Sequence, residues 1–231
     1  MNILHISCSP RGREAESDRL ARKIIGLLSG RYPHVKVVDR EIGDGSLSHI
    51  DGNYALTQHS ATAKASHTGG VATSDALIGE LEAADLVVIG TPMHNMSIPS
   101  ALKAWIDHVV RARRTFNSGP QGKVGTLRDR PVFVAVASGG RFSGERATQP
   151  DFLTPYLKTI LGSIGLHDVN FFSVEGTGGS EEGVALARAR TDRLLDAYFL
   201  PERELACASA DTKTGLAVFN VPTHYNPGSE P

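Results

Sequence analysis

The chain has 231 residues, a net charge of −1 and an isoelectric point near 6.8. This length corresponds to one large domain, or one domain with an additional segment, and it allows a core that needs no disulfide bonds. A hydrophobic share of 40% with 21% charged residues is ordinary for a globular protein. The composition therefore argues against disorder throughout, and the lack of a basic excess argues against nucleic acid as a partner.

The two cysteines, Cys8 and Cys207, form neither a disulfide framework nor a zinc motif. At the end of an expected strand, Cys8 is typical of a small buried residue. The longest wholly apolar run, Val132–Ala137, is too short to cross a membrane. The first residues, Met1–Ser9, lack the features of a secretory signal. We therefore expect a cytoplasmic protein that does not associate with membranes.

The beginning of the chain alternates between strand and helix patterns. Asn2–Ser7 is a short apolar run that predicts a strand. Ser17 is expected to cap the following helix, which Gly30 ends. A second strand is expected at Val35–Asp39. The segment Glu41–Gly70 is polar and has no long apolar face, so we expect a loop with short helical pieces.

The central part continues the alternation. A helix is expected over Thr73–Ala84 and a buried strand over Leu86–Ile89. Ser97–Arg113 shows the clearest helical periodicity, with Pro99 in its first turn, where a missing amide hydrogen has no cost. Asn117–Arg130 is rich in turn-forming residues and predicts an irregular connection.

The remainder contains two further strands and two helices. The strands are expected at Pro131–Ala137 and Val169–Val174, and the helices at Phe152–Ile164 and Glu181–Phe199. The segment 201–231 contains prolines and no clear periodicity, so we expect a C-terminal extension or tail after a single domain of residues 1–200.

The five strands are continuous apolar runs separated by helices, which indicates helices on both faces of the sheet. Right-handed crossovers between such strands form an open parallel sheet, and the fold class is therefore α/β. Ligands of these sheets bind beyond the carboxyl ends of the strands. The loops at Ser9–Ser17, Thr91–Met96 and Ser138–Arg141 leave such ends, and we expect them to converge.

The first loop offers the hydroxyls of Ser9 and Ser17 together with the amides of a helix N-terminus, a combination that fits a phosphate group. Ser17 can equally be no more than a helix cap. In the second loop, the planar amide of Asn95 can pair with a flat heterocycle. In the third, Gly139 and Gly140 allow the backbone to approach a ligand, although a plain turn explains them too.

Other phosphate-binding patterns do not occur. The chain contains no GxxxxGK[ST] motif. Gly176, Gly178 and Gly179 resemble GxGxxG, but Glu181 replaces the third glycine. A cysteine phosphatase needs C-x5-R, and the residue at that spacing from Cys8 is a glutamate.

From Asn2 to Leu200 the chain resembles the FMN-dependent NADH-azoreductase family, also called NADH:quinone reductases. The most specific motifs are Thr91–Asn95, Ile98–Lys103, Arg111-Ala112 and Thr115-Phe116, and further support comes from Thr154–Leu157 and Leu161–Gly165. The resemblance implies a flavodoxin-like fold with five strands in the order 2-1-3-4-5. It also implies bound FMN, NADH or NADPH as electron donor, quinones or azo compounds as acceptors, and a homodimer whose sites are completed by the second subunit.

The resemblance places the FMN-binding residues in the three loops: Ser9, Ala15, Glu16, Ser17, Met93, His94, Asn95, Met96, Ser138, Gly139 and Gly140. The first four would hold the phosphate, the next four would run along the isoalloxazine ring, and the last three would close its far edge. His94 and Asn95 are candidate contacts of the ring or substrate. No catalytic side chain and no metal is expected, because the chemistry takes place on FMN.

The chain departs from the family at positions that build the acceptor pocket. His94 and Met96 replace residues that are usually or commonly aromatic, and Phe142 stands where a polar residue is expected. The loop Phe116–Gly122 is also shorter than in the best-known members of the family. These departures concern the acceptor more than the binding of FMN.

The leading hypothesis is an FMN-dependent oxidoreductase in which the nicotinamide leaves before the acceptor binds, a ping-pong mechanism. One alternative is a flavodoxin-like electron carrier, although a net charge of −1 provides little steering field. The other is an interaction protein that keeps the fold without a cofactor.

Overall fold

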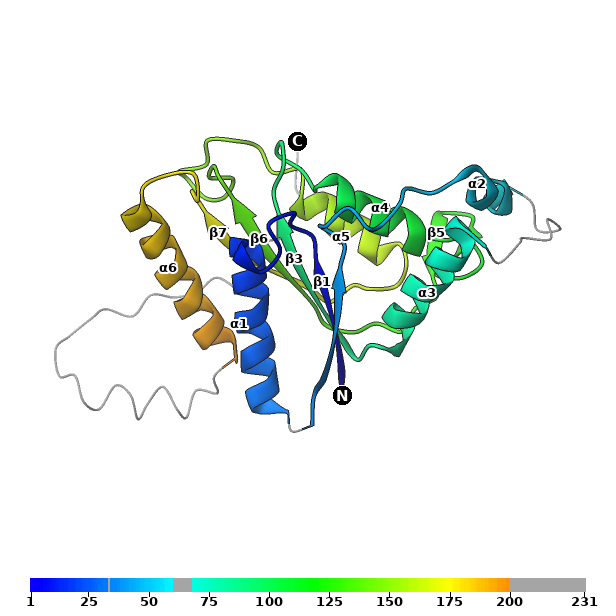
Figure 1. Ribbon diagram of the computed structural model, residues 1–231, viewed down its shortest axis with the longest axis horizontal. Helices are drawn as coiled ribbons and strands as arrows, with labels where there is room; N and C mark the ends of the chain where they lie inside the picture. Colours follow the sequence, from blue (N-terminus) through cyan, green and yellow to red (C-terminus); the bar gives the residue numbers. More distant parts are fainter. Residues whose placement is uncertain (33, 60–67, 200–231) are drawn as a thin grey trace, which may run out of the picture.

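The computed structural model describes residues 1–32, 34–59 and 68–199 (Figure 1). One parallel sheet has the strand order β2-β1-β3-β6-β7. Its strands are β1 (Asn2–Ser7), β2 (Lys36–Glu41), β3 (Leu86–Pro92), β6 (Val132–Ser138) and β7 (Val169–Glu175). The expected order 2-1-3-4-5 is confirmed, because β4 and β5 form a separate hairpin.

Helices cover both faces of the sheet, as Figure 1 shows. On one face lie α1 (Glu16–Arg31) and α6 (Glu181–Phe199). The other face carries α3 (Gly70–Ala83), α4 (Ser100–Val109) and α5 (Thr154–Gly162). Side chains alternate between these two cores along each strand: in β3, Val87 and Ile89 belong to one core, and Leu86 and Val88 to the other.

Two strands run two or more residues further toward the site than the apolar pattern predicted. β2 continues to Glu41 because its neighbour pairs with it as far as Ser7. β3 continues through Thr91 and Pro92, which lie opposite Val136 and Ala137 of β6. Ladder hydrogen bonds from a neighbouring strand thus override weak local strand propensity at these ends.

The start of α1 differs from the prediction. Ala15 is the N-cap residue and makes no side-chain capping bond, whereas Ser17 lies inside the first turn. The prediction of Ser17 as the N-cap was therefore wrong. The chain first makes a short 3₁₀ turn, Gly12–Glu14, in which the amide of Ala15 donates to the carbonyl of Gly12. This turn shifts the helix start toward the preceding strand.

Two helix starts are set by aspartates that precede them in the chain. Asp51 accepts the amide of Gly70, 19 residues away, so α3 begins three residues before the expected Thr73. Asp151 accepts the amides of Leu153 and Thr154, which delays α5 by two residues. The first of these contacts joins segments that are distant in the chain, so apolar periodicity cannot predict it.

The long helix expected over Ser97–Arg113 is limited to α4, Ser100–Val109. Pro99 has ψ 155° and is extended, so it precedes the helix instead of lying in its first turn. At the other end, Val110 leaves helical geometry and Arg113 has φ 64°. The predicted apolar stripe is correct, but the residues at both ends of the predicted helix belong to loops.

The connection expected to be irregular contains a hairpin of β4 (Phe116–Gly119) and β5 (Gly122–Gly125). In the polar segment, α2 (Gly52–His59) is one of the expected short helical pieces. The predicted extension 201–231 lies outside the described residues. Within the described ranges, no helix is long and apolar enough to cross a membrane.

The loop after β2 packs tightly against the loop after β1. A Cβ atom at Gly43 would lie 2.2 Å from the carbonyl oxygen of Ser9, whereas one at Gly26 of α1 would meet nothing within 4 Å. We therefore expect Gly43→Ala to lower the free energy of unfolding by roughly 1–3 kcal/mol. The control, Gly26→Ala, should raise it by about 1 kcal/mol, because alanine favours an exposed helix. Urea unfolding of both variants measures the change in the free energy of unfolding. Equal changes in the two variants would contradict the close packing of Gly43 against Ser9.

Candidate functional site

The three loops expected to converge do so because their strands are neighbours. β1, β3 and β6 lie side by side and run parallel, so the segments that follow Ser7, Pro92 and Ser138 emerge at one edge of the sheet. Backbone contacts connect the last two segments, since the amide of Met93 donates to the carbonyl of Ala137 at 2.8 Å.

The turn between β1 and α1 has the character of an anion site. The side chains of Ser9 and Ser17 are 4% and 1% exposed, respectively. The Ser9 hydroxyl accepts the Arg11 amide at 3.3 Å, whereas Ser17 Oγ has no partner in the described part of the protein. A buried hydroxyl without a hydrogen bond is costly. Together with the first amides of α1, it is well suited to a phosphate group.

Glu16 places a carboxylate beside this turn, and its charge is compensated by two arginines. Arg19 Nε donates to Glu16 Oε1 at 2.6 Å, and Arg188 Nη2 donates to Oε2 at 2.6 Å. The second contact joins α1 to α6, 172 residues later. Both bonds hold the carboxylate in place, so an anion at the helix start meets less repulsion.

The loop between β3 and α4 is a tight hairpin. The amides and carbonyls of His94 and Ser97 exchange two hydrogen bonds of 2.9 and 3.0 Å. The two residues between them, Asn95 and Met96, have φ angles of 48° and 67°. Asparagine tolerates this left-handed region, but methionine rarely adopts it. Strain of this kind is concentrated at functional sites. The side chains of His94, Asn95 and Met96 are exposed at the edge.

Gln149 is a site residue that sequence reasoning missed. Its Nε2 lies 3.0 Å from Ser138 Oγ and 3.1 Å from Met93 Sδ, so it joins the second loop to the third. A further bond runs from the amide of Phe152 to the carbonyl of Met96. Gln149 stands in the polar segment after β6, and no motif there distinguishes it.

The two glycines of the third loop have different roles. A Cβ at Gly139 would meet nothing within 4 Å, which leaves space for a ligand. A Cβ at Gly140 would lie 2.6 Å from Gln149 Oε1, so this glycine makes room for a side chain of the protein. The carbonyls of Ser138, Gly139 and Gly140 accept amides from the loop after β7.

Phe142 is packed in the interior of the protein. It is 9% exposed and belongs to the core on the α3–α5 face. Its amide donates to Glu175 Oε2 at 2.9 Å. The aromatic residue therefore contributes to packing, which explains why the expected polar residue is absent.

A polar cluster lies next to the turn between β1 and α1. Buried His5 contacts Asp39 Oδ1 through Nδ1 at 2.7 Å, and its Nε2 lies 3.7 Å from Asp18 Oδ1. The Asp39 side chain is 52% exposed, and its partial desolvation opposes ionisation, but the hydrogen bond and charge of His5, with help from Arg22, lower the pKa of this carboxyl. The cluster connects β1, β2 and the first turn of α1.

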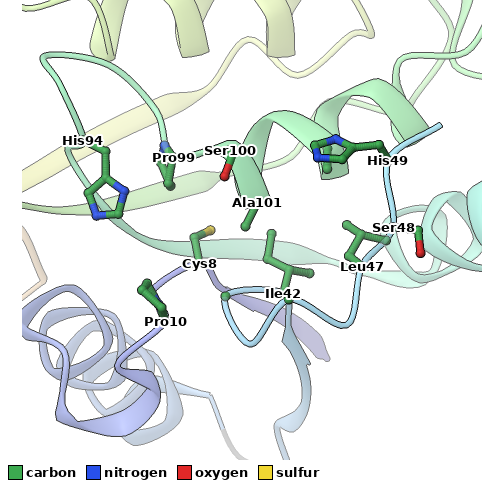
Figure 2. Close-up of a pocket in the computed structure, with 13 residues that line it drawn as sticks. Cys8, Pro10, Ile42, Leu47, Ser48, His49, His94, Pro99, Ser100 and Ala101 are labelled. Carbon is green, nitrogen blue, oxygen red and sulfur yellow. The ribbon is translucent and has the colours of Figure 1, made fainter.

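A cavity of about 360 Å³ adjoins these loops on the β2 side (Figure 2). Pro10 and His94 stand at its edge. Cys8 also lines it, and burial raises the pKa of this thiol above its ordinary value, which disfavours the thiolate. No cluster of metal-ligating side chains occurs among the described residues. The edge can therefore bind and orient a ligand.

The sequence matches the protein family described as Flavodoxin-like fold over residues 1–195. A relative from Pseudomonas fluorescens, FMN-dependent NADH:quinone oxidoreductase 4, is 45% identical over 90% of this chain and 99% of its own length. FMN-dependent NADH:quinone oxidoreductase 2 of Cupriavidus pinatubonensis is 45% identical over 79% of this chain and 90% of its own.

Among solved structures, the azoreductase from Bacillus anthracis str. Sterne superposes with a TM-score of 0.71 at 23% identity, covering 85% of this chain and 99% of that one. This likeness confirms the fold. By fold, the protein is a flavodoxin-like α/β protein. With the sequence relatives, the chain belongs to the family of FMN-dependent NADH:quinone oxidoreductases.

The lowered pKa of Asp39 has a consequence for stability. A carboxyl with a depressed pKa stabilises the fold above its unfolded pKa, ~3.9, and this contribution is lost as the pH falls through the folded value. We expect Asp39→Asn to lower the urea midpoint at pH 7, and the difference from wild type to shrink toward pH 3. Glu145→Gln, at an exposed position, is the control. A difference that does not change with pH would contradict the role of the His5 contact.

Proposed function

We propose that this protein is an FMN-dependent oxidoreductase that transfers two electrons from NADH or NADPH to quinones or azo compounds. The observation that carries the proposal is the buried, unpartnered hydroxyl of Ser17 at the start of α1. It stands at the same sheet edge as two loops that are shaped to approach a flat ligand.

The described residues fit FMN in three places. Ser9, Ser17 and the first amides of α1, from Glu16 onward, would hold the phosphate, with Ala15 placing them at the helix start. The loop Met93–Met96 would lie along the isoalloxazine ring, with the Asn95 amide available for its polar atoms. The open side of Gly139 would admit the far edge of the ring.

When bound, FMN would supply the redox chemistry, namely acceptance of a hydride from the nicotinamide and donation of two electrons to the acceptor. The protein provides position and charge. Amides at the helix start favour the phosphate dianion, and the bonds of Gln149 to Ser138 and Met93 keep the ring loops together. Since one edge serves both partners, we propose that the donor leaves before the acceptor binds, a ping-pong order.

A homodimer and a cytoplasmic location belong to the same proposal. Met96 and Phe152 are 42% and 59% exposed, and they meet where the Phe152 amide donates to the Met96 carbonyl. Exposed apolar side chains at a site edge favour coverage by a second subunit. Light scattering should report twice the chain mass of 24.6 kDa. A monomer would remove the shared-site part of the proposal.

Ser17 offers a direct test of the phosphate turn. Because its hydroxyl has no partner in the fold, Ser17→Ala should leave the unfolding temperature of the FMN-free protein unchanged or slightly raised. It should raise the dissociation constant of FMN about 10- to 100-fold, since a hydrogen bond to a charged group contributes roughly 1.5–3 kcal/mol. Ser29→Ala, on the exposed far end of α1, is the matched control. Unaltered FMN affinity in Ser17→Ala would place the phosphate elsewhere.

The reaction is tested by visible spectroscopy. The purified protein is incubated with FMN, desalted and mixed anaerobically with NADH. We expect a retained flavin spectrum that bleaches and then recovers when a quinone is added. A flavin spectrum that neither NADH nor NADPH bleaches would instead indicate an electron carrier. Failure to retain FMN would indicate an interaction protein and would overturn the proposal.

A further inference from the structure

The polar cluster around His5 lies on the face of the sheet that α1 covers. His5 is a fully buried residue of β1, and Ile3, two positions earlier on the same side of the strand, belongs to the core beneath α1. Asp39 lies opposite His5 in β2, and Asp18 lies in the first turn of α1. On its other side His5 pairs with Val88 of β3, which is apolar. The imidazole ring is therefore placed between two carboxylates.

The hydrogen-bonding requirements of these groups fix the protonation of the ring. His5 Nδ1 lies 2.7 Å from Asp39 Oδ1, and an ionised carboxylate only accepts hydrogen bonds, so Nδ1 carries a hydrogen. In a neutral ring Nε2 would then be an acceptor, yet it lies 3.7 Å from Asp18 Oδ1, which is an acceptor as well. An imidazolium ring, which carries a hydrogen on both nitrogens, removes this conflict.

The Asp18 carboxylate is only half satisfied without His5. Its Oδ2 accepts a hydrogen bond from Arg22 Nε at 2.7 Å. Its Oδ1 is buried, and neither this atom nor His5 Nε2 has a hydrogen-bond partner within the described ranges. Because Asp18 is 1% exposed, water does not screen its charge, and a buried charge requires compensation nearby.

The count of charges around the ring leads to the same result. Asp18 and Asp39 contribute two negative charges. Arg22 lies between them, because its Nε contacts Asp18 and its Nη2 lies 3.8 Å from Asp39 Oδ1. Arg13, which is exposed in the 3₁₀ turn before α1, acts through its charge on Asp39. A positively charged His5 supplies the compensation that buried Asp18 lacks.

The charge of Asp18 matters to the phosphate turn because Asp18 directly follows Ser17. The Ser17 hydroxyl is the buried, unpartnered group that we assign to the FMN phosphate. A carboxylate in the first turn of a helix uses the same positive end of the dipole as a bound anion. The other acidic residue of this turn, Glu16, is already bound by Arg19 and Arg188. Asp18 is therefore the carboxylate whose charge would repel a phosphate dianion.

We propose that His5 is a positively charged positioning residue of the phosphate site. Its ring donates to Asp39 through Nδ1 and directs a second hydrogen toward Asp18 through Nε2, so that Asp18 does not repel the phosphate at Ser17. His5 acts through Asp18 and is not itself a ligand of the phosphate. The inference rests on the proposed FMN-dependent function.

Nuclear magnetic resonance tests the charge of His5 directly on the wild-type, FMN-loaded protein. With nitrogen-15-labelled histidine, both ring nitrogens of His5 should have the chemical shifts of protonated nitrogens at pH 7. The signals are assigned through their correlations to the backbone of His5, so this measurement needs no variant. A neutral ring, with one protonated and one bare nitrogen, would overturn the inference.

The variant His5→Gln removes the charge and keeps a side-chain donor. FMN and riboflavin differ only in the phosphate, so their dissociation constants separate an effect on the phosphate turn from a general loss of structure. We expect His5→Gln to raise the dissociation constant of FMN about three- to tenfold, and that of riboflavin by less than about twofold. An equal rise for both ligands would show a merely structural role and contradict the inference.

The matched control is His108→Gln. His108 is also buried, but it lies in α4 on the opposite face of the sheet, where its Nε2 is 2.9 Å from the carbonyl of Ser48. This variant should leave the ratio of the FMN and riboflavin dissociation constants unchanged. The unfolding temperature of each variant without flavin reports any loss of stability.

Combining His5→Gln with Asp18→Asn separates charge compensation from packing. If His5 acts by compensating Asp18, removal of that carboxylate should restore the FMN dissociation constant to within about twofold of the wild type. A further loss of affinity on top of the first would contradict the inference. If wild-type protein binds no FMN, or binds FMN no more tightly than riboflavin, the proposed phosphate site itself fails. If it binds FMN through the phosphate while His5 is neutral, this inference alone is wrong, and the two failures are distinguishable.

Discussion

The parallel pairing of β1 with β3 and of β3 with β6 is the constraint on which the site depends. Because all three strands run in the same direction, their following loops emerge at one edge and can share a single ligand. Extension of β3 through Thr91 and Pro92 brings the second loop next to the third. A shift of register by one residue would reverse the face of every strand side chain and separate these loops.

At the sheet edge that carries the three loops, a rigid scaffold surrounds a buried polar group that has no hydrogen-bond partner. Gln149, His108 and Asp51 each join segments that are distant in sequence or structure, and they keep the loops in place. Against this rigid background, the Ser17 hydroxyl is left without a partner and Met96 is held in left-handed backbone geometry. Such local exceptions are tolerated where a ligand compensates for them, which is why they indicate the binding edge.

Much of the fold could be predicted from apolar periodicity. The bounds of β1 and α6 match the prediction, and the strand order follows from the resemblance. The errors occur where a turn or a polar contact, which apolar periodicity does not record, decides a local conformation. Ser17 has the identity of a cap, but the preceding 3₁₀ turn places it inside the helix. The composition of Phe116–Gly125 predicts an irregular connection, but the segment forms a hairpin. This hairpin is closely packed, because a Cβ at Gly125 would lie 2.1 Å from the Gly165 amide nitrogen.

The sequence by itself determined the alternation of strands and helices, the three loops and the family motifs around Asn95, because these depend on neighbours in the chain. The tertiary structure decided which polar groups remain free in those loops. It also showed that Gly139 faces open space while Gly140 faces Gln149, and that His108 of α4 contacts the wall of a cavity. These properties arise from contacts between residues that are distant in the chain, which only packing of the whole domain establishes.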